Sequence, residues 1–275
     1  MADTYHLICG DARQRFASRH LIERGFRVRT YGVPAMQENE IPAQFGQDDI
    51  LILPFPSFQG LLFRGKFAIA PQEILHRVGS GCRVFGGILG NWKGQLEAQG
   101  ALVTDLYGSE PLTTANAVPT AEGAIQLAME RSEITIHGAR CLVIGYGRVG
   151  SVLAQKLHAL CAQVTVCARN PAQRAAAQAL GMHTDEPLLY RYGLHQYDFV
   201  FNSVPDTVIS EDQLAKLSPN CRLFELASKP GGIPEELCYE LGLSYHFAPG
   251  LPGLCAPATA GARYAESVLQ CVGHI

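Results

Sequence analysis

The chain has 275 residues, of which 47% are hydrophobic and 17% are charged, and its formal net charge is −3. This length allows one large domain or two modest ones, each with a buried core. Without a basic excess there is little attraction for a nucleic-acid backbone, and no apolar run reaches the roughly 18 residues that span a bilayer, so we expect neither nucleic-acid nor membrane binding.

The amino-terminal residues and the cysteines point to a reducing compartment. Residues 1–5 contain no basic leader followed by an apolar stretch, so we expect no export signal and a cytoplasmic location. The nine cysteines form no Cys-x-x-Cys pair, and several lie in apolar strand-like runs. Their spacing disfavours a metal site, and we expect buried, reduced thiols that act as small hydrophobic residues.

Short apolar strands alternate with helical stretches along almost the whole chain. This alternation predicts an α/β fold with two doubly wound parallel-sheet domains. The first domain, residues 1–117, is expected on the substrate side and has a predicted helix over 12–24. Its predicted strands are 5–9, 27–31, 49–53, 83–85 and 101–103.

Pro119 is expected to begin a helix over 120–131 that connects the two domains, because proline is well tolerated in a first helical turn. Residues 118–275 would then comprise this linker helix, the second α/β domain, and a last helix over 257–272 that packs back toward the first domain. The predicted strands of the second domain are 141–144, 164–168, 199–202, 223–226 and 244–247.

A glycine-rich segment directly after the strand 141–144 is the clearest functional signal. Gly145 permits a tight turn, Gly147 lets the backbone approach a pyrophosphate, and Gly150 allows helix and strand to pack closely. The free N–H groups at the start of the following helix suit phosphates, which makes an ordinary glycine-rich turn the weaker explanation. The sequence therefore predicts that the second domain is a Rossmann dinucleotide-binding domain. Its nicotinamide dinucleotide site would include Gly145, Tyr146, Gly147, Arg148, Val149 and Gly150.

The end of the next predicted strand favours the phosphorylated cofactor. A site for NAD needs an acidic residue there, about 20 residues on, to bind the ribose 2′-hydroxyl. The strand ends in Ala168, Arg169 and Asn170 and offers no carboxylate. The planar guanidinium of Arg169 suits a 2′-phosphate, and Asn170 could add a hydrogen bond, so we expect NADP. A solvated surface arginine is the alternative explanation of Arg169.

Two later loops are expected to complete the cofactor site, because loops that follow the strands line the cofactor cleft in this fold. One should lie beside the ribose and nicotinamide, and the other, 227–232, should lie over the nicotinamide. The residues concerned are Asn202, Ser203, Val204, Pro205, Ala227 and Ser228.

Cys161 occupies the turn after the helix that follows the glycines, where a glycine would be expected. Either Cys161 adopts a left-handed backbone conformation, or this turn differs from the usual one.

Five motifs in order along nearly the whole chain resemble the family of the dipicolinate synthase A subunit. The more specific two are Ser-Lys-Pro-Gly-Gly at 228–232 and Pro-Gly-Leu-Pro-Gly at 249–253. The others are Gly-Asp-Ala-Arg-Gln at 10–14, Val-Pro-Thr-Ala-Glu-Gly at 118–123 and the glycine loop at 145–150. The resemblance is weakest over about 32–110, where the layout is similar but no motif stands out.

The resemblance implies an NADP-dependent oxidation of dihydrodipicolinate, or of its hydrated precursor from the lysine pathway, to dipicolinate in sporulating bacteria. It also implies a flavoprotein-like B subunit as partner, and we expect a homo-oligomer. The layout is similar to that of D-2-hydroxyacid dehydrogenases, which use an Arg, a Glu and a His. Here Lys229 stands roughly where that Arg would be, and an expected loop at 249–253 replaces the segment that would carry the His.

The missing histidine suits this chemistry, because oxidation of a dihydropyridine forms an aromatic ring and needs a strong base less than an alcohol does. Cations are needed for the two carboxylates. Lys229, with Ser228 beside it, and Arg13 are the candidate anchors; a solvated loop lysine and an arginine paired with Asp11 are the alternatives. Glu122 would either take the ring proton or cap the helix on the Thr120 side.

Two other functions stay open at this point. One is an NADP-dependent 2-hydroxyacid or amino-acid dehydrogenase, which the absent histidine disfavours. The other is a non-catalytic NADP-binding regulatory protein, which the proposed second anion site at Lys229 and Arg13 disfavours mildly.

Overall fold

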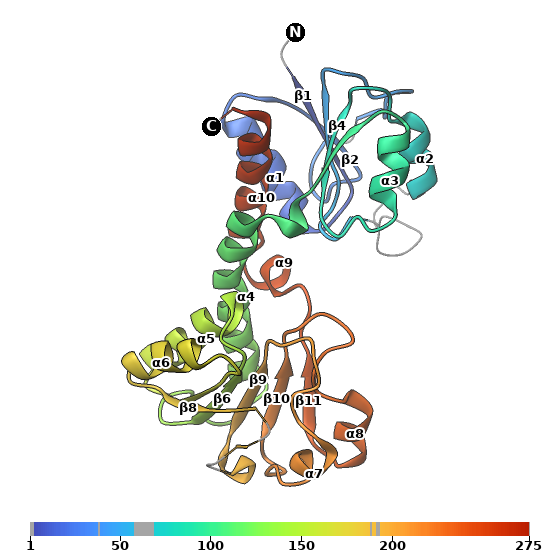
Figure 1. The fold of residues 1–275 in the computed structure, drawn as a ribbon. Helices are drawn as coiled ribbons and strands as arrows, with labels where there is room; N and C mark the ends of the chain where they lie inside the picture. The colour runs from blue at the N-terminus through green and yellow to red at the C-terminus, as the bar shows by residue number, and fades with distance from the viewer. Residues whose placement is uncertain (1–2, 38, 58–68, 188, 191–192, 275) are drawn as a thin grey trace. The chain divides into compact units, whose positions relative to one another are not determined.

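The computed structural model describes residues 3–37, 39–57, 69–187, 189–190 and 193–274 (Figure 1). It divides into unit 1, residues 1–116 and 252–275, and unit 2, residues 117–251. Met1 and Ala2, part of the segment in which no leader was expected, lie outside the described residues. Each unit is built on a parallel sheet, which confirms the predicted α/β class with two doubly wound sheets.

Unit 1 has a five-stranded parallel sheet in the order β2-β1-β3-β4-β5. The strands are β1 (Thr4–Ile8), β2 (Arg27–Tyr31), β3 (Asp49–Ile52), β4 (Arg83–Gly86) and β5 (Leu102–Asp105). The helices are α1 (Ala12–Glu23), α2 (Pro71–Arg77), α3 (Trp92–Ala98), the short 3-10 helix η1 (Leu106–Gly108) and α10 (Pro257–Val272). Helices α2 and α3 cover one face of the sheet, and α1 with α10 the other (Figure 1).

The last helix, α10, packs tightly on α1. Leu21 of α1 and Tyr264 and Val268 of α10 are buried in one hydrophobic cluster with strand residues. A Cβ added at Gly261 of α10 would lie 2.4 Å from the backbone oxygen of Arg13. The glycine therefore lets the two helices approach each other more closely than any side chain would permit.

Unit 2 has a six-stranded parallel sheet in the order β11-β10-β9-β6-β7-β8, which is the strand order of a Rossmann fold. The strands are β6 (Arg140–Ile144), β7 (Gln163–Cys167), β8 (His183–Asp185), β9 (Phe199–Asn202), β10 (Arg222–Glu225) and β11 (Ser244–Phe247). The helices are α5 (Arg148–Ala159), α6 (Pro171–Ala179), the 3-10 helix η2 (Leu194–Gln196), α7 (Glu211–Leu214) and α8 (Glu235–Glu240). A hydrophobic cluster fills each face of the sheet.

The connecting helix differs from the prediction. Helix α4 runs from Glu110 to Glu130, so the expected start at Pro119 was wrong, and Pro119 lies inside the helix. An internal proline lacks the N–H for one helical hydrogen bond and costs about 3 kcal/mol. Burial offsets this cost, because Ala117, Ala121, Ala124 and Ala128 are all buried at helical spacing. Thr120 is therefore an interior residue of α4 and does not cap its start.

The segment 249–253, expected to be a loop, is partly helical. Helix α9 extends from Leu251 to Cys255 and includes its second half. Strand β8, which is only three residues long, was not predicted at all. Both elements are too short to produce a periodic hydrophobic pattern.

The cysteines match the expectation in most positions. All nine are free, and six of them are buried. Burial raises the pKa of the Cys141, Cys167 and Cys221 thiols to about 12. These thiols are therefore neutral at physiological pH and pack as small hydrophobic groups.

Cys161, in the turn after α5, adopts the left-handed conformation, with φ 62°. This conformation costs a non-glycine residue about 1–2 kcal/mol, and glycine's extra freedom in the unfolded chain offsets about 0.4–1 kcal/mol of that. We expect Cys161→Gly to raise the free energy of unfolding by about 0.5–1 kcal/mol in urea denaturation. The control is Cys271→Gly, because the exposed Cys271 lies within the helix α10. Glycine is unfavourable inside a helix, so this control should lower the free energy of unfolding. Equal changes in the free energy of unfolding in both variants would contradict a cost from the left-handed backbone of Cys161.

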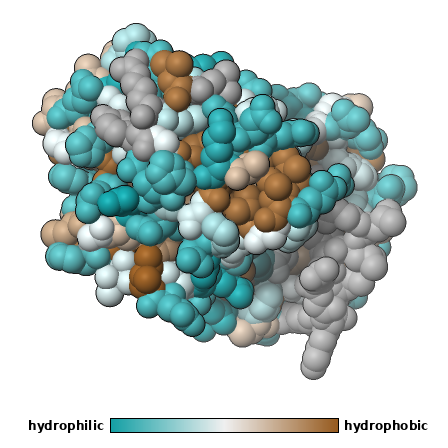
Figure 2. Space-filling model, turned by 90° about the horizontal axis from the view of Figure 1, so that it is seen from below, coloured by the Kyte–Doolittle hydropathy of each residue, from teal (hydrophilic) through white to brown (hydrophobic). Residues whose placement is uncertain are grey.

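The surface seen from below is mainly hydrophilic, with several separate hydrophobic patches (Figure 2). None of the described helices is both long and apolar enough to span a membrane.

Candidate functional site

A cavity of about 680 Å³ lies in unit 2 at the carboxyl ends of β6, β7 and β9. In the sheet, β6 lies between β7 and β9. Strands β7 and β8 extend the sheet on one side of β6, and β9 to β11 extend it on the other, so the strand order reverses at this point. Ligands of open α/β sheets bind at such a switch point. Its lining includes the following residues singled out from the sequence: Gly145, Tyr146, Gly147, Arg148, Val149, Ala168, Arg169, Asn170, Ser203, Val204 and Pro205.

The three glycines of the loop after β6 have the geometry that their roles require. Gly145 has φ +92°, and a Cβ there would lie 2.6 Å from the Ser203 Oγ. A Cβ at Gly150 would lie 2.2 Å from the Gly145 backbone oxygen, so Gly150 permits close packing. A Cβ at Gly147 would meet nothing within 4 Å, which leaves space for a ligand at this point of the loop.

The start of α5 suits a phosphate group. Gly147 is the N-cap residue and has no side chain that could cap the first N–H groups of the helix. Those N–H groups and the helix dipole favour an anion. Among the charged residues that line the cavity, Arg148 and Arg169 are positive and Asp206 is negative. The described residues therefore fit the pyrophosphate of a dinucleotide.

The loop between β7 and α6 is held by a second arginine, Arg174, which sequence reasoning did not identify. Its Nη1 donates to the carbonyl oxygens of Ala168 (2.7 Å) and Arg169 (2.8 Å), and its Nη2 donates to Glu186 at 2.9 Å. The Oδ1 of Asn170 accepts from the Ala172 N–H at 2.9 Å and caps α6. Arg169 itself is exposed at the cavity, on a backbone that these bonds fix.

Four of the residues expected to bind the cofactor do not line the cavity: Gly150, Asn202, Ala227 and Ser228. Gly150 is buried beneath the loop that it packs against. Asn202 is fully buried, and its side chain bonds both the N–H and the carbonyl of Val204. Ala227 is buried, and Ser228 is exposed.

Glu225, at the end of β10, is a fully buried carboxylate that sequence reasoning missed. Asn202 donates to it at 2.9 Å, and so do backbone N–H groups of the loop that follows. A charged residue at the end of an apolar strand, Leu223-Phe224-Glu225, was the available signal.

Lys229 is an exposed residue of the loop after β10, where ligands bind in this fold. Its Nζ lies 5.3 Å from the centre of the Phe247 ring. Among the described residues no carboxylate forms an ion pair with it. Its ammonium group is therefore available to an anion, and Ser228 precedes it in the same loop.

Glu122 is already paired. Its Oε1 accepts from the Lys156 Nζ at 2.8 Å, which joins α4 to α5 on an exposed surface. Because α4 begins at Glu110, one of the two alternatives for Glu122, a cap of the helix on the Thr120 side, was wrong.

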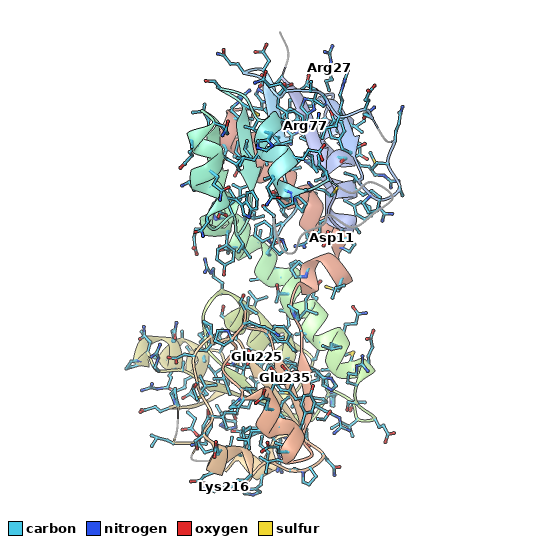
Figure 3. All side chains as sticks on the ribbon, turned by 90° about the vertical axis from the view of Figure 1, so that its right-hand side faces the viewer. Asp11, Arg27, Arg77, Lys216, Glu225 and Glu235 are labelled. Carbon is cyan, nitrogen blue, oxygen red and sulfur yellow. The ribbon has the colours of Figure 1, made fainter. Side chains whose placement is uncertain are left out.

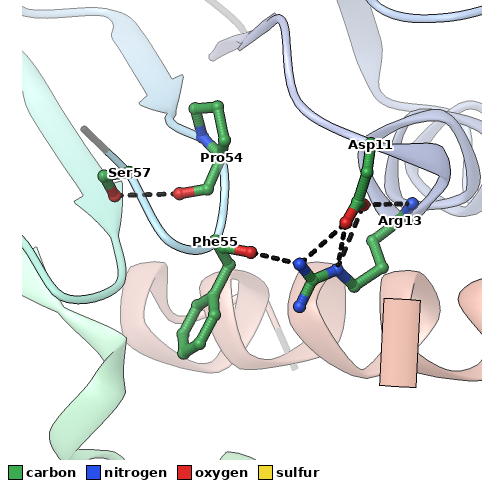
Figure 4. A network of polar contacts seen from close by, with 5 residues as sticks. All are labelled: Asp11, Arg13, Pro54, Phe55 and Ser57. Carbon is green, nitrogen blue, oxygen red and sulfur yellow. Dashed lines mark hydrogen bonds and ion pairs between the residues drawn. The ribbon is translucent and has the colours of Figure 1, made fainter. Parts of the chain in front are cut away.

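Arg13 lies in unit 1, whereas the other three catalytic candidates lie in unit 2. Its Nε and Nη2 bond the Asp11 carboxylate, and Nη2 also bonds the Phe55 carbonyl oxygen (Figure 4). Nη1 has no partner among the described residues. A Cβ at Gly253 would lie 2.7 Å from the Asp11 Oδ2, so Gly253 leaves room for this ion pair. The pairing with Asp11 was the alternative explanation of Arg13, and it is what the structure shows.

Across the described ranges, no group of histidine, cysteine or carboxylate side chains is arranged to hold a metal ion.

Comparisons with known proteins agree with this geometry. The family model of the D-isomer specific 2-hydroxyacid dehydrogenase, NAD binding domain, matches residues 100–228. The A subunit of dipicolinate synthase from Bacillus subtilis (strain 168) is 31% identical over 98% of this chain and 95% of its own length. The crystal structure of the dipicolinate synthase A subunit from Bacillus halodurans has a TM-score of 0.87 at 27% identity, covering 98% of this chain and 97% of that one. The corresponding Bacillus subtilis structure has a TM-score of 0.85 at 28% identity, covering 100% and 97%.

The match to a dehydrogenase domain supports an oxidoreductase with a nicotinamide dinucleotide as its cofactor. The identity of 31% extends over both units, well beyond the residues that the dehydrogenase domain model matches. This chain therefore belongs to the family of the dipicolinate synthase A subunit.

Proposed function

We propose that this chain oxidises dihydrodipicolinate, formed from the lysine-pathway intermediate, to dipicolinate with NADP as the oxidant. The observation that carries the proposal is the similarity to the dipicolinate synthase A subunit over 98% of the chain. The cavity in unit 2 supplies a cofactor site, and Lys229 supplies a cation without a carboxylate partner among the described residues.

The preference for NADP rests on the end of β7. Arg169 is exposed at the cavity, and no acidic residue stands at this strand end to bind a ribose 2′-hydroxyl. Because Arg174 holds the carbonyls of Ala168 and Arg169, the guanidinium of Arg169 extends from a fixed backbone. A fixed, planar donor suits a phosphate.

The chain's own residues would bind and orient the reactants. The loop at 145–150 would hold the pyrophosphate, and the loop after β9 would flank the ribose and the nicotinamide. The bound nicotinamide supplies a hydride acceptor. Lys229 and Ser228 would hold one substrate carboxylate and thereby fix the substrate ring against the nicotinamide.

Arg13 and Glu122 have weaker claims to a catalytic role. Arg13 is paired with Asp11, so only its Nη1 remains to reach the second carboxylate. Glu122 is neutralised by Lys156 and would have to leave that ion pair to accept a proton. Because aromatisation supplies much of the driving force, the reaction needs no strong base.

We also propose that the chain works in the cytoplasm of a sporulating cell with a flavoprotein-like B subunit. The Bacillus subtilis relative is one subunit of a synthase, which supports a partner chain. A homo-oligomer is proposed as well.

The direct test mixes the purified chain with the candidate B subunit, the lysine-pathway intermediate and NADP. Dipicolinate should appear by its ultraviolet spectrum at a rate that depends on this chain. If NADP binds but no dipicolinate forms with both proteins present, the proposed reaction is wrong and only the cofactor site stands. Turnover of a 2-hydroxy acid or an amino acid instead would favour a dehydrogenase.

Replacing Lys229 by methionine removes the charge but keeps an unbranched side chain that is one atom shorter. We expect the affinity for dipicolinate to fall about tenfold, which corresponds to loss of about 1.5 kcal/mol for a charge-assisted hydrogen bond. Calorimetric titration of dipicolinate into the NADP-saturated protein measures this. The control Lys216→Met changes an exposed lysine elsewhere in unit 2 and should have no effect (Figure 3). Equal affinities in wild type and Lys229→Met would exclude Lys229 as an anchor.

A further inference from the structure

The carboxyl ends of β9 and β10 are joined by two side chains. Asn202 and Glu225 are the last residues of these strands and are register partners in the parallel ladder. The Asn202 Nδ2 lies 2.9 Å from both carboxylate oxygens of Glu225 and 2.9 Å from the carbonyl oxygen of Val204. The Asn202 side chain thus links the start of the loop after β9 to the end of β10.

The Glu225 carboxylate is fully buried and accepts several hydrogen bonds. Besides Asn202, it accepts from the N–H groups of Ala227 (3.0 Å), Gly232 (2.9 Å) and Ile233 (3.0 Å). No cation of the described residues pairs with it. A buried charge is costly unless it is well hydrogen-bonded, so these donors are needed for the carboxylate to stay in place. Glu225 lies inside unit 2 (Figure 3).

These bonds fix both ends of the loop 227–233. Ala227 and Ile233 bracket the segment, and both donate to the same carboxylate. A Cβ on Gly232 would lie 2.4 Å from the Asp206 carbonyl oxygen, so this loop also packs closely on the loop after β9. That second loop lines the cofactor cavity through Ser203 to Val208. One buried carboxylate therefore ties the cofactor loop to the loop that carries Lys229.

We infer that Glu225 is a positioning residue for substrate: it holds the loop 227–233 so that the Lys229 ammonium presents one fixed cation beside the cofactor loop. This inference rests on the proposed role of Lys229. Phe247, over which the Lys229 Nζ lies, is the register partner of Glu225 on β11. Glu225, at the end of β10, thus bonds the loop 227–233 and lies beside the strand residue whose ring contacts the Lys229 side chain.

The test replaces Glu225 by glutamine, which keeps the shape of the side chain. The amide N–H₂ group of glutamine is itself a donor, so it cannot accept the backbone N–H bonds that one carboxylate oxygen accepts. The probe is dipicolinate, titrated by calorimetry into protein saturated with NADP. Glu225→Gln should lower its affinity about tenfold, while the matched control Glu236→Gln, at an exposed position of α8, should not change it. If Glu225→Gln does not fold, Glu225→Asp, which keeps the charge on a shorter side chain, should show a loss in the same direction.

A double-mutant cycle separates positioning from general destabilisation. If Glu225 acts through Lys229, then Glu225→Gln should change dipicolinate affinity by less than about twofold in a Lys229→Met background. Full, additive losses in that background would overturn the inference. Unchanged dipicolinate affinity in Glu225→Gln itself would also overturn it.

Amide hydrogen exchange without ligand keeps this inference distinct from the proposed function. In Glu225→Gln, exchange over residues 227–233 should become faster, while the strand β6 stays protected. If wild type fails to bind dipicolinate, the proposed substrate is wrong, and unchanged exchange in the loop would then overturn the positioning role as well. Faster exchange in the loop 227–233 together with the loss of dipicolinate affinity supports the positioning role of Glu225.

Discussion

Arg169→Ala is expected to bind NADPH about 10- to 100-fold more weakly than wild type, while its affinity for NADH stays within about twofold. A charge-assisted hydrogen bond contributes about 1.5–3 kcal/mol, and only NADPH has the 2′-phosphate that would accept it. Fluorescence titration with each reduced cofactor measures both affinities in the same buffer.

The environment of Arg169 lets this variant report on cofactor binding without a change in the fold of the loop. The side chain is exposed, and the backbone carbonyls of Ala168 and Arg169 are held by Arg174 and do not depend on the Arg169 side chain. The fold of the loop should therefore survive the substitution.

The control for charge alone is Arg140→Ala. Arg140 is an exposed arginine at the start of β6, at the opposite end of the strand from the glycine loop. It should leave both affinities unchanged. Equal binding of NADPH and NADH by wild type, or tighter binding of NADH, would contradict the assignment of Arg169 to the 2′-phosphate.

Two substitutions in the glycine loop should separate folding from cofactor binding. Gly150→Val is expected to lower the free energy of unfolding by about 3 kcal/mol or more, because the added Cβ would lie 2.2 Å from the Gly145 backbone oxygen. Gly147→Val should change stability by less than about 1 kcal/mol, since nothing lies within 4 Å of its added Cβ. It should nevertheless bind NADPH about 100-fold more weakly, because the valine fills the space kept for the pyrophosphate.

Urea denaturation and NADPH titration of both variants check this pair. Gly94→Val is the control for valine at an open position, because a Cβ at Gly94 of α3 also meets nothing within 4 Å. It should leave cofactor affinity intact. Wild-type affinity for NADPH in a folded Gly147→Val protein would show that the cofactor does not approach this loop.

Much of the fold could be predicted from the sequence because its signals are local. The predicted strands at 27–31, 199–202 and 244–247 and the helix at 257–272 agree with β2, β9, β11 and α10. Alternating apolar runs and turn residues define such elements within a few positions of the chain. The glycine loop is local for the same reason: Gly145 and Gly150 are five residues apart and meet within one strand–turn–helix unit.

Contacts between distant residues decided the rest. Helix α4 continues through Pro119 because burial of its apolar residues outweighs local helix propensity. Glu122 meets Lys156 across 34 positions, and Asn202 meets Glu225 across 23. No short-range pattern marks such pairs, because their partners are chosen by strand order and helix packing.

By itself, the sequence determined the α/β class, the Rossmann cofactor loop and the family resemblance, since each depends on short motifs with fixed backbone requirements. Only the tertiary structure decided which charged groups are engaged. It pairs Glu122 with Lys156, and it buries Glu225 among donors that include Asn202. The physical reason is that a side chain's availability depends on the neighbours that folding brings to it, and those neighbours lie far away in the chain.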